Sequence, residues 1–286
     1  DVLDILRDRG VNWVRLRVWH DPVLEGGFSD RESLVRMAAR VKAKGFKLLV
    51  NFHYSDHWAD PGKQTKPAAW QELSFPELTQ AVYEYTRDVV QDLAQAGALP
   101  DMVQIGNEIR AGMLWPDGRL GTPANEYGSD FDRLAALLKA GIEGVHAGSR
   151  AWLAAQGGAA PVGAGSDRGR VLIALHLDDG GNNGLYRWWF DEITRRDVPF
   201  DVIGVSYYPY WHGTIEQLKR NLADISRRYD KDVAVFETAY AFTLADADGH
   251  PNIFGPQQAR TAGYPVSVEG QAAALRAVFE AVAQVP

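Results

Sequence analysis

The sequence predicts an α/β protein of the (β/α)8, or TIM-barrel, class, with the first and last strands of the barrel missing from this chain. Three observations predict this class. Short apolar runs alternate with amphipathic helical stretches along the whole chain, which is typical of a parallel sheet. The first predicted strand is not followed by the Gly-rich turn of a nucleotide-binding doubly wound sheet. Polar and aromatic residues follow nearly every strand, and barrels carry their sites at that face.

The composition suits one large core. The chain has 286 residues, of which 46% are hydrophobic, and α/β barrels run to this length as one domain. No linker interrupts the pattern, so we expect a single domain over residues 1–286, and a monomer. The formal net charge of −7 argues against a nucleic-acid partner. No apolar run approaches the ~20 residues of a membrane span, and the lack of cysteine excludes disulfides and thiolate metal sites.

The first half of the chain contains three predicted strands. Residues 1–9 are expected to form a short helix that Gly10 ends. The helical stretches show an apolar stripe of period 3.6, and the strands are short apolar runs that suit burial on both faces. We predict strands at 11–19, 47–54 and 102–108, and helices at 32–44, 78–96 and 131–146.

The second half continues the alternation. We predict strands at 171–177, 201–208 and 233–237, and helices at 185–196, 215–229 and 268–283. Six strands are two fewer than a closed barrel needs, and the chain begins and ends with a helix. We therefore expect one strand to be missing at each end, and residues 1–286 alone to be poorly stable and inactive, because two exposed sheet edges carry unpaired backbone groups.

Site-like side chains occur at the end of every predicted strand. On the first strand Arg15, Arg17 and Trp19 lie on one face, because side chains alternate with period two. A single polar strand end is more often a cap or a loop contact than part of a site, but six of them indicate a functional rim. The other strand-end residues are Asn51, His53, Tyr54, Asp56, His57, Trp58, Asn107, Glu108, His176, Asp178, Tyr207, Tyr208 and Glu237.

Two carboxylates directly follow apolar strands. Glu108 ends the run from Val103, and Glu237 ends the run from Val233. Glycoside cleavage requires two carboxyl groups on either side of the scissile bond, which lie ~5–5.5 Å apart in retaining enzymes. The alternative is that each glutamate forms a structural ion pair with Arg15 or Arg17.

The Asn107–Glu108 pair, with Glu237 at a later strand end, resembles clan A of the glycoside hydrolases. More specifically, the chain resembles the arabinogalactan endo-β-1,4-galactanases of glycoside hydrolase family 53, over nearly its whole length. The matching stretches are GVNWVRLRVWHDP (10–22), LLVNFHYSDHWADPGKQTKPAAW (48–70), QIGNEIRAGMLWPDG (104–118), LHLDDGGNNGLYRWWFD (175–191), DVIGVSYYPYWHGT (201–214) and VFETAYAFT (235–243).

This resemblance implies a secreted retaining enzyme that cleaves β-1,4-galactan, a side chain of pectin, without a catalytic cofactor. It implies that Glu108 is the acid/base, that Glu237 is the nucleophile and that Asn107 binds the sugar 2-hydroxyl. The family has an active-site Trp on its eighth strand, which this chain lacks. The other roles that the resemblance implies are an arginine beside the nucleophile (Arg15 or Arg17), a lining of the −1 subsite (His53, His176, Tyr207), stacking platforms (Trp58, Trp115) and hydroxyl contacts (Asp56, Asp178). Each tryptophan has the alternative role of a loop anchor.

A possible calcium loop follows Glu237. Asp246, Asp248, His250 and Asn252 alternate around Gly249, and hard oxygen ligands suit Ca²⁺. No glutamate occupies the last position of an EF-hand, so the loop is not of that type. Bacterial members of the resembled family hold calcium in this region, with some ligands from a loop that this chain lacks. The alternative is a polar turn without metal.

Two other functions remain open. The glutamate pair is shared with β-mannanases and cellulases of the same clan, and only the HWADPGKQ and AGMLWP stretches favour galactan. A non-catalytic carbohydrate-binding barrel is the third possibility, but a binding module has no need of either glutamate.

Overall fold

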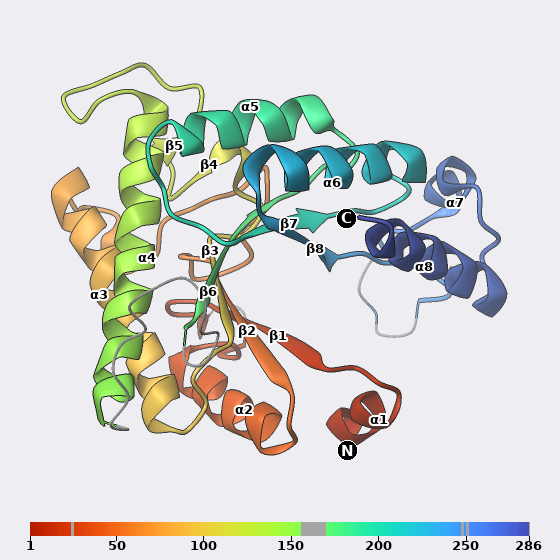
Figure 1. Cartoon of the computed structure of the whole chain (residues 1–286), viewed down its shortest axis with the longest axis horizontal. Coiled ribbons are helices and arrows are strands. Elements are labelled where there is room, and N and C mark those ends of the chain that lie inside the picture. The colour runs from red at the N-terminus through yellow and green to blue at the C-terminus, as the bar shows by residue number, and fades with distance from the viewer. Residues whose placement is uncertain (24–25, 156–169, 247–248, 250–251, 286) are drawn as a thin grey trace. The chain divides into compact units, whose positions relative to one another are not determined.

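The computed structural model describes residues 1–23, 26–155, 170–246, 249 and 252–285 (Figure 1). These residues form two compact units. The first comprises Asp1–Leu175 with Ile193–Phe200, and the second comprises His176–Glu192 with Asp201–Pro286. Strand β6 begins in the first unit and ends in the second. The expectation of a single domain over 1–286 stays a prediction.

The first unit contains a parallel sheet. Its strands, in spatial order, are β1 (Trp13–Val18), β2 (Lys47–Phe52), β3 (Met102–Ile105) and β6 (Leu172–Leu177). The register pairs Arg17 with Asn51 and Asn51 with Gln104. Register partners in a sheet point to the same face, so this row places three polar side chains side by side.

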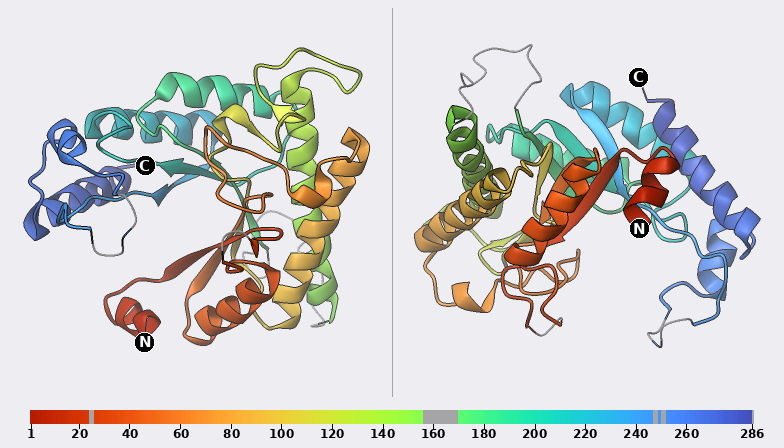
Figure 2. Two further views of the ribbon diagram at one scale, coloured as in Figure 1. Left: turned by 180° about the vertical axis from the view of Figure 1, so that it is seen from behind. Right: turned by 90° about the horizontal axis from the view of Figure 1, so that it is seen from below.

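Helices α1 (Val2–Asp8), α2 (Arg31–Ala43), α3 (Phe75–Gln95) and α4 (Asp130–Ala155) accompany this sheet. The α3 helix runs beside α4, as Figure 1 and both views of Figure 2 show. Gly144 and Gly148 of α4 allow this close approach: a Cβ atom on Gly144 would lie 2.6 Å from the Tyr83 carbonyl oxygen, and one on Gly148 would lie 2.6 Å from the Arg87 carbonyl oxygen.

Short elements complete the first unit between its main strands and helices. They are the 3₁₀ turns η2 (Ala68–Trp70) and η3 (Ile109–Ala111) and the antiparallel hairpin of β4 (Gly112–Met113) and β5 (Gly118–Arg119). None of these was predicted, because each is too short to show a hydrophobic period.

The second unit contains the parallel strands β7 (Val202–Ser206) and β8 (Asp232–Glu237). Its helices are α5 (Asn183–Thr194, whose last two residues belong to the first unit), α6 (Ile215–Tyr229), α7 (Pro256–Ala262) and α8 (Val268–Ala283). A buried apolar cluster of Tyr210, Tyr240, Phe254 and Ala274 connects the loop after β7 with the segment after β8 and with α8.

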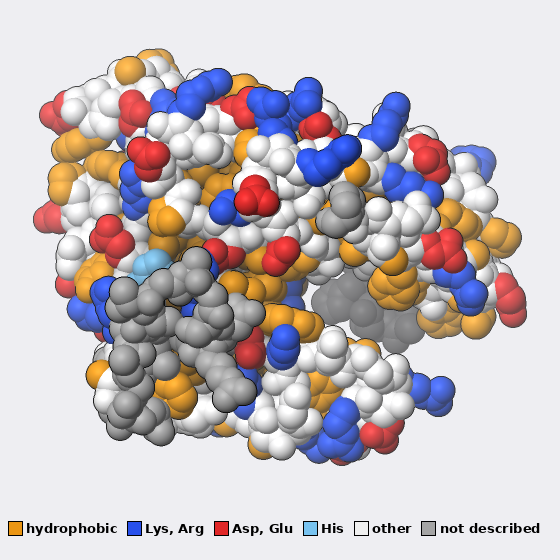
Figure 3. All heavy atoms as spheres, viewed as in Figure 1, with side chains coloured by type: hydrophobic (Ala, Val, Ile, Leu, Met, Phe, Trp, Pro, Cys, Tyr) orange, Lys and Arg blue, Asp and Glu red, His pale blue; other side chains and the backbone are white. Residues whose placement is uncertain are grey.

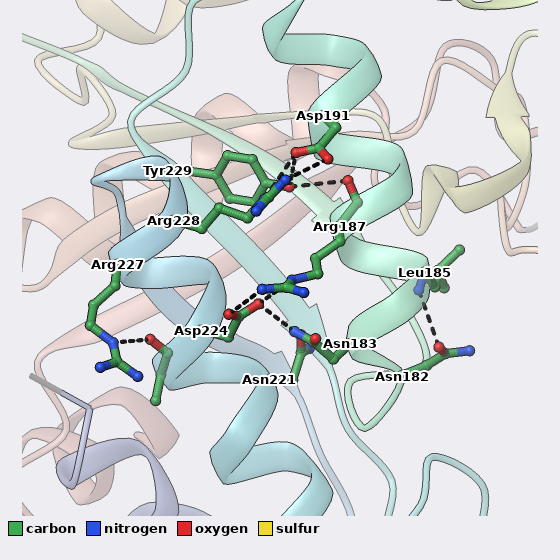
Figure 4. Close-up of polar contacts among 11 residues, drawn as sticks. Asn182, Asn183, Leu185, Arg187, Asp191, Asn221, Asp224, Arg227, Arg228 and Tyr229 are labelled. Atoms are coloured by element: carbon green, nitrogen blue, oxygen red, sulfur yellow. Dashed lines mark hydrogen bonds and ion pairs between the residues drawn. The ribbon is translucent and has the colours of Figure 1, made fainter.

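Polar contacts join α5 to α6 (Figure 4). Arg187 Nε lies 2.8 Å from Asp224 Oδ2, and Arg228 Nη2 lies 2.7 Å from Asp191 Oδ2. The Tyr229 hydroxyl also donates to Asp191. Figure 3 shows charged side chains of both signs over these two helices. Exposed pairs of this kind stabilise by only ~0–1 kcal/mol each, so they contribute little to the stability of the unit.

Every predicted strand and helix is present in the predicted order, with differences at the boundaries. Helix α3 begins at Phe75, three residues before the prediction, because Ser74 and Glu77 form a capping box with Pro76 in the first turn. Helix α4 continues to Ala155, nine residues past its predicted end. Among the described residues, no helix has both the length and the apolar composition needed to cross a membrane.

One boundary matters for the site. The strand predicted at 102–108 ends at Ile105, so the prediction that Glu108 lies on a strand is wrong. Gly106 has a φ of 78° and Glu108 a φ of 51°, both in the left-handed region. Glycine tolerates that conformation without steric cost, and it turns the chain out of the sheet.

Gly144→Ala is expected to destabilise the protein. Alanine is the better helix former by up to ~1 kcal/mol, but its methyl group would meet the α3 backbone, and overpacking costs ~1–3 kcal/mol. Urea unfolding should show a lower midpoint. Gly184→Ala is the matched control, because the nearest atom to its added Cβ is 3.7 Å away, and it should be neutral or stabilising. Equal stability of the two variants would contradict the close α3–α4 contact.

Candidate active site

The Asn107 side chain is the centre of the polar group in the first unit. Its Oδ1 accepts hydrogen bonds from Arg15 Nη2 at 2.9 Å and from Asn51 Nδ2 at 3.0 Å. Its Nδ2 donates to the Ala59 carbonyl at 2.8 Å. Since an amide nitrogen carries two hydrogens, one of them is left for a ligand. A sugar hydroxyl is a suitable acceptor for it.

Gln104 connects Arg15 of β1 to the turn after β3. Its Oε1 accepts a hydrogen bond from Arg15 Nε at 3.0 Å, and its Nε2 donates to the Gly106 carbonyl at 2.8 Å. Gln104 is fully buried. The sequence analysis assigned no role to Gln104, and it named Asn51 only as a strand-end residue. Each is a polar residue within an apolar strand, and this was the signal in the sequence that could have pointed to both.

Glu108 follows β3 in a strained turn. It is 9% exposed and has φ and ψ of 51° and 52° at the N-cap of η3. A non-glycine residue in this region costs on the order of 1–3 kcal/mol, and such strain concentrates at functional sites. The carbonyl of the preceding residue, Asn107, accepts a hydrogen bond from Gln64 Nε2 at 2.8 Å.

His53 is buried in the same group and is neutral. Its Nδ1 accepts a hydrogen bond from the Ala59 amide at 3.1 Å, and its Nε2 lies 3.1 Å from Asn51 Nδ2. Burial, together with the positive charges of Arg15 and Arg17, lowers the pKa of His53 from 6.5 to about 3. The His53 ring is therefore not a source of charge at neutral pH.

Trp58 presents a ring to solvent. It is 51% exposed, and the Arg17 guanidinium carbon lies 4.3 Å from its ring centroid and 4.5 Å from that of Trp19. The two indole rings meet edge to face at 5.3 Å. Arg17 thereby fixes the orientation of Trp58, which leaves a rigid aromatic surface that suits the apolar face of a sugar.

Asp56 and Trp115 hold loops in place. Asp56 accepts hydrogen bonds from the amides of Asp21 at 2.9 Å and Ala68 at 2.8 Å. Trp115 Nε1 donates to the Ala111 carbonyl at 3.0 Å, and Arg119 covers its ring at 4.4 Å. These contacts give both residues an anchoring role, and the sugar contacts expected of them stay predictions.

Glu237 ends β8 in the second unit. Its Oε2 accepts a hydrogen bond from the Tyr208 hydroxyl at 3.0 Å. Ser206 pairs with Glu237 and not with Phe236, so β8 contains a bulge at Phe236. The ring of Phe236 occupies the space over Gly204, where a Cβ atom would lie 2.2 Å from it. Bulges beside functional sites re-aim side chains, and this one determines the direction of Glu237.

The other predicted residues of this unit are buried. His176 Nε2 lies 2.9 Å from Ser206 Oγ, and Asp178 is 4% exposed. Tyr207 is fully buried, its hydroxyl donates to the Gly213 carbonyl at 2.9 Å, and burial raises the pKa of Tyr207. The neighbouring Tyr208, for which sequence reasoning proposed no role, is the tyrosine that contacts Glu237.

Two of the four predicted calcium ligands can be described. Asp246 Oδ1 accepts a hydrogen bond from the Gly249 amide at 2.9 Å. Asn252 Nδ2 lies 3.4 Å from the carbonyl oxygens of both Leu244 and Ala245. The two ends of the loop, at Leu244 and Asn252, therefore lie close together. Asp248 and His250 lie outside the described residues.

The family model for glycosyl hydrolase family 53 matches residues 1–286. The chain belongs to this family. It is therefore a glycosidase, as the resemblance implied.

Curated relatives agree with this assignment. The chain is 35% identical to a Bacillus subtilis protein named endo-beta-1,4-galactanase, over 99% of this chain and 60% of that protein. It is 34% identical to the arabinogalactan endo-beta-1,4-galactanase of Thermothelomyces thermophilus, over 99% of this chain and 76% of that protein.

Solved structures confirm the fold class. The family 53 catalytic domain of Ignisphaera aggregans matches with a TM-score of 0.83 at 43% identity, over 98% of this chain and 72% of that domain. A fungal β-1,4-galactanase structure matches with a TM-score of 0.79 at 32% identity, over 100% of this chain and 77% of that chain. The six strands are those of part of a (β/α)8 barrel, as predicted.

His53 is expected not to titrate in the folded protein between about pH 7.5 and 4.5, because its pKa is about 3. Unfolding returns this pKa to ~6.5, so the unfolded state binds more protons between these values. The contribution of His53 to the free energy of unfolding should therefore fall as the pH drops from ~6.5 towards 3. NMR of ¹⁵N-labelled imidazole, with the urea-unfolded chain as control, checks this. A folded-state midpoint near 6 would contradict the burial described for His53.

Proposed function

We propose that this chain hydrolyses β-1,4-galactosidic bonds within galactan chains and retains the anomeric configuration. The observation that carries the proposal is the position of Glu108 in the turn that follows β3 and of Glu237 at the end of β8, in a chain of family 53. The names of the relatives at 34–35% identity support galactan as the substrate.

In the first step, a Glu237 carboxylate oxygen attacks the anomeric carbon and forms a glycosyl ester. The bond from that carbon to the leaving oxygen breaks, and the Glu108 carboxyl group gives its proton to this oxygen. The leaving sugar departs as an alcohol. For this step the two carboxyl groups must lie ~5–5.5 Å apart.

In the second step, the Glu108 carboxylate removes a proton from a water molecule. The water oxygen attacks the anomeric carbon, the ester bond breaks, and Glu237 is released as a carboxylate. Two inversions return the β configuration. Both steps use only carboxyl groups and water, so the reaction needs no catalytic cofactor.

The neighbouring side chains support these roles. The Tyr208 hydroxyl holds Glu237 by a hydrogen bond at 3.0 Å. The remaining hydrogen of Asn107 Nδ2 suits the sugar 2-hydroxyl, a contact that strengthens in the transition state. The exposed ring of Trp58 suits sugar stacking. We include the other predicted substrate-binding residues in the proposal: Arg15, Arg17, His53, Asp56, Trp115, His176, Asp178 and Tyr207.

We further propose that the enzyme is a monomer and acts outside the cell. The reason for the location is that polymeric galactan is too large to enter a cell.

The loop 244–252 is proposed as a structural Ca²⁺ site. Support comes from the carboxylate of Asp246 and from the closure of the loop by Asn252, because Ca²⁺ takes 6–8 oxygen ligands. The site has no part in the chemistry.

Glu108→Gln and Glu237→Gln are each expected to abolish most of the activity on galactan, for different reasons. Glu237→Gln removes the nucleophile, so azide should restore turnover with an inverted product. Glu108→Gln removes general acid–base catalysis, worth ~10²–10⁴-fold, but should retain activity on aryl galactosides with good leaving groups. Reducing-sugar assays on galactan, mannan and cellulose test the substrate. Equal failure of both variants on aryl galactosides, without azide rescue, would show that the roles are wrong.

Calcium is expected to raise the thermal midpoint. Binding to the folded state alone stabilises it by RT ln(1 + [L]/Kd), so added Ca²⁺ should raise the midpoint, and chelation should lower it. Asp246→Ala should abolish the shift, whereas Mg²⁺ should produce little of it. An identical midpoint in Ca²⁺ and in chelator would refute the calcium site.

A further inference from the structure

Gln64 is a buried residue in the loop between β2 and α3. It is 2% exposed, and its Nε2 donates to two carbonyl oxygens, those of Asp60 at 3.0 Å and Asn107 at 2.8 Å. Its backbone carbonyl accepts a hydrogen bond from the Trp115 amide at 2.7 Å. Both hydrogens of the side-chain amide are therefore used, and the residue is fixed from three directions.

The bond to Asn107 acts on the backbone of Glu108. The Asn107 carbonyl belongs to the peptide plane that leads into Glu108, and the orientation of this plane is coupled to the φ of Glu108. That φ is 51°, in the left-handed region, which a glutamate does not favour on its own. A hydrogen bond to the carbonyl holds the peptide plane in the orientation that the left-handed residue requires.

The loop of Gln64 also carries the exposed ring of Trp58. Two contacts fasten this loop. The Asp56 carboxylate accepts a hydrogen bond from the Ala68 amide at 2.8 Å, and Lys66 Nζ, which is 5% exposed, lies 2.8 Å from Asp117 Oδ2. Gln64 thus joins a rigid loop beside the proposed substrate to the turn that bears Glu108.

We propose that Gln64 is a positioning residue for the acid/base function of Glu108. This inference rests on the proposed function, in which Glu108 protonates the leaving oxygen. Gln64 itself does not touch the reacting atoms. It sets the direction of the Glu108 carboxyl group by holding the Asn107 peptide plane.

A purely structural role would have a different signature. If Gln64 only closed its loop, loss of its donors would lower stability and would slow all substrates by the same factor. If the Glu108 carboxyl group is displaced, hydrolysis slows most for substrates whose leaving group has a high pKa, because such a group must be protonated as it leaves. The dependence of rate on leaving-group pKa therefore separates the two roles.

The test is Gln64→Met, which keeps the length of the side chain and removes both donors. The matched control is Gln71→Met, because Gln71 Nε2 also donates to a loop carbonyl, that of Lys66 at 2.8 Å, without touching Asn107. The measurement is kcat/KM on aryl β-galactobiosides, from dinitrophenyl to phenyl leaving groups, with unfolding midpoints for each variant. If Gln64→Met does not fold, Gln64→Leu replaces it, since its apolar side chain likewise cannot donate to either carbonyl.

Gln64→Met is expected to slow the phenyl substrate by about ten-fold or more, which is the effect of losing one hydrogen bond that controls geometry. The dinitrophenyl substrate should change by less than about three-fold, and Gln71→Met should leave the leaving-group dependence unchanged. Equal slowing of all substrates, or no effect, would overturn the inference while leaving the proposed function intact. A flat leaving-group dependence in Glu108→Gln would instead overturn the acid/base assignment, and this inference with it.

Discussion

The hydrogen bonds of one amide side chain, that of Asn107, hold the first unit's part of the site together. Arg15 and Asn51 donate to its oxygen, and its nitrogen donates to the Ala59 carbonyl. These partners come from β1, β2 and the loop after β2. Because strands of a parallel sheet have a fixed register, side chains on them can keep such a geometry to within a fraction of an ångström.

This network explains why polar groups are tolerated in a buried sheet. An unpaired buried polar group costs ~1–3 kcal/mol, and a charge costs more. The Arg15 guanidinium donates to both Gln104 and Asn107, so its partial burial is offset by charge-assisted hydrogen bonds. The left-handed turn at Glu108 adds a further local cost, which the bonds from Gln104 and Gln64 to this turn help to offset.

In the second unit, the direction of the Glu237 side chain is set by packing as well as by hydrogen bonds. The Phe236 ring needs the empty space over Gly204, and this requirement places the bulge one residue before Glu237. The ion pairs between α5 and α6 lie on the exposed surface and contribute little stability individually. The direction of Glu237 therefore depends on a glycine and an aromatic ring in neighbouring strands, and on the Tyr208 hydroxyl.

The sequence by itself determined the six main strands, the long helices, their order and the fold class, because hydrophobic periods and capping residues are local signals; it did not indicate the short elements or α7. It also singled out Glu108 and Glu237, because each follows an apolar run. The tertiary structure decided the rest. Gln64 and Asn107 are 43 positions apart in the chain, and Arg15 and Gln104 are 89 apart. No local pattern encodes such contacts. The role of Gln64, and the hydrogen bond of Tyr208 rather than Tyr207 to Glu237, likewise depend on residues far apart in the chain.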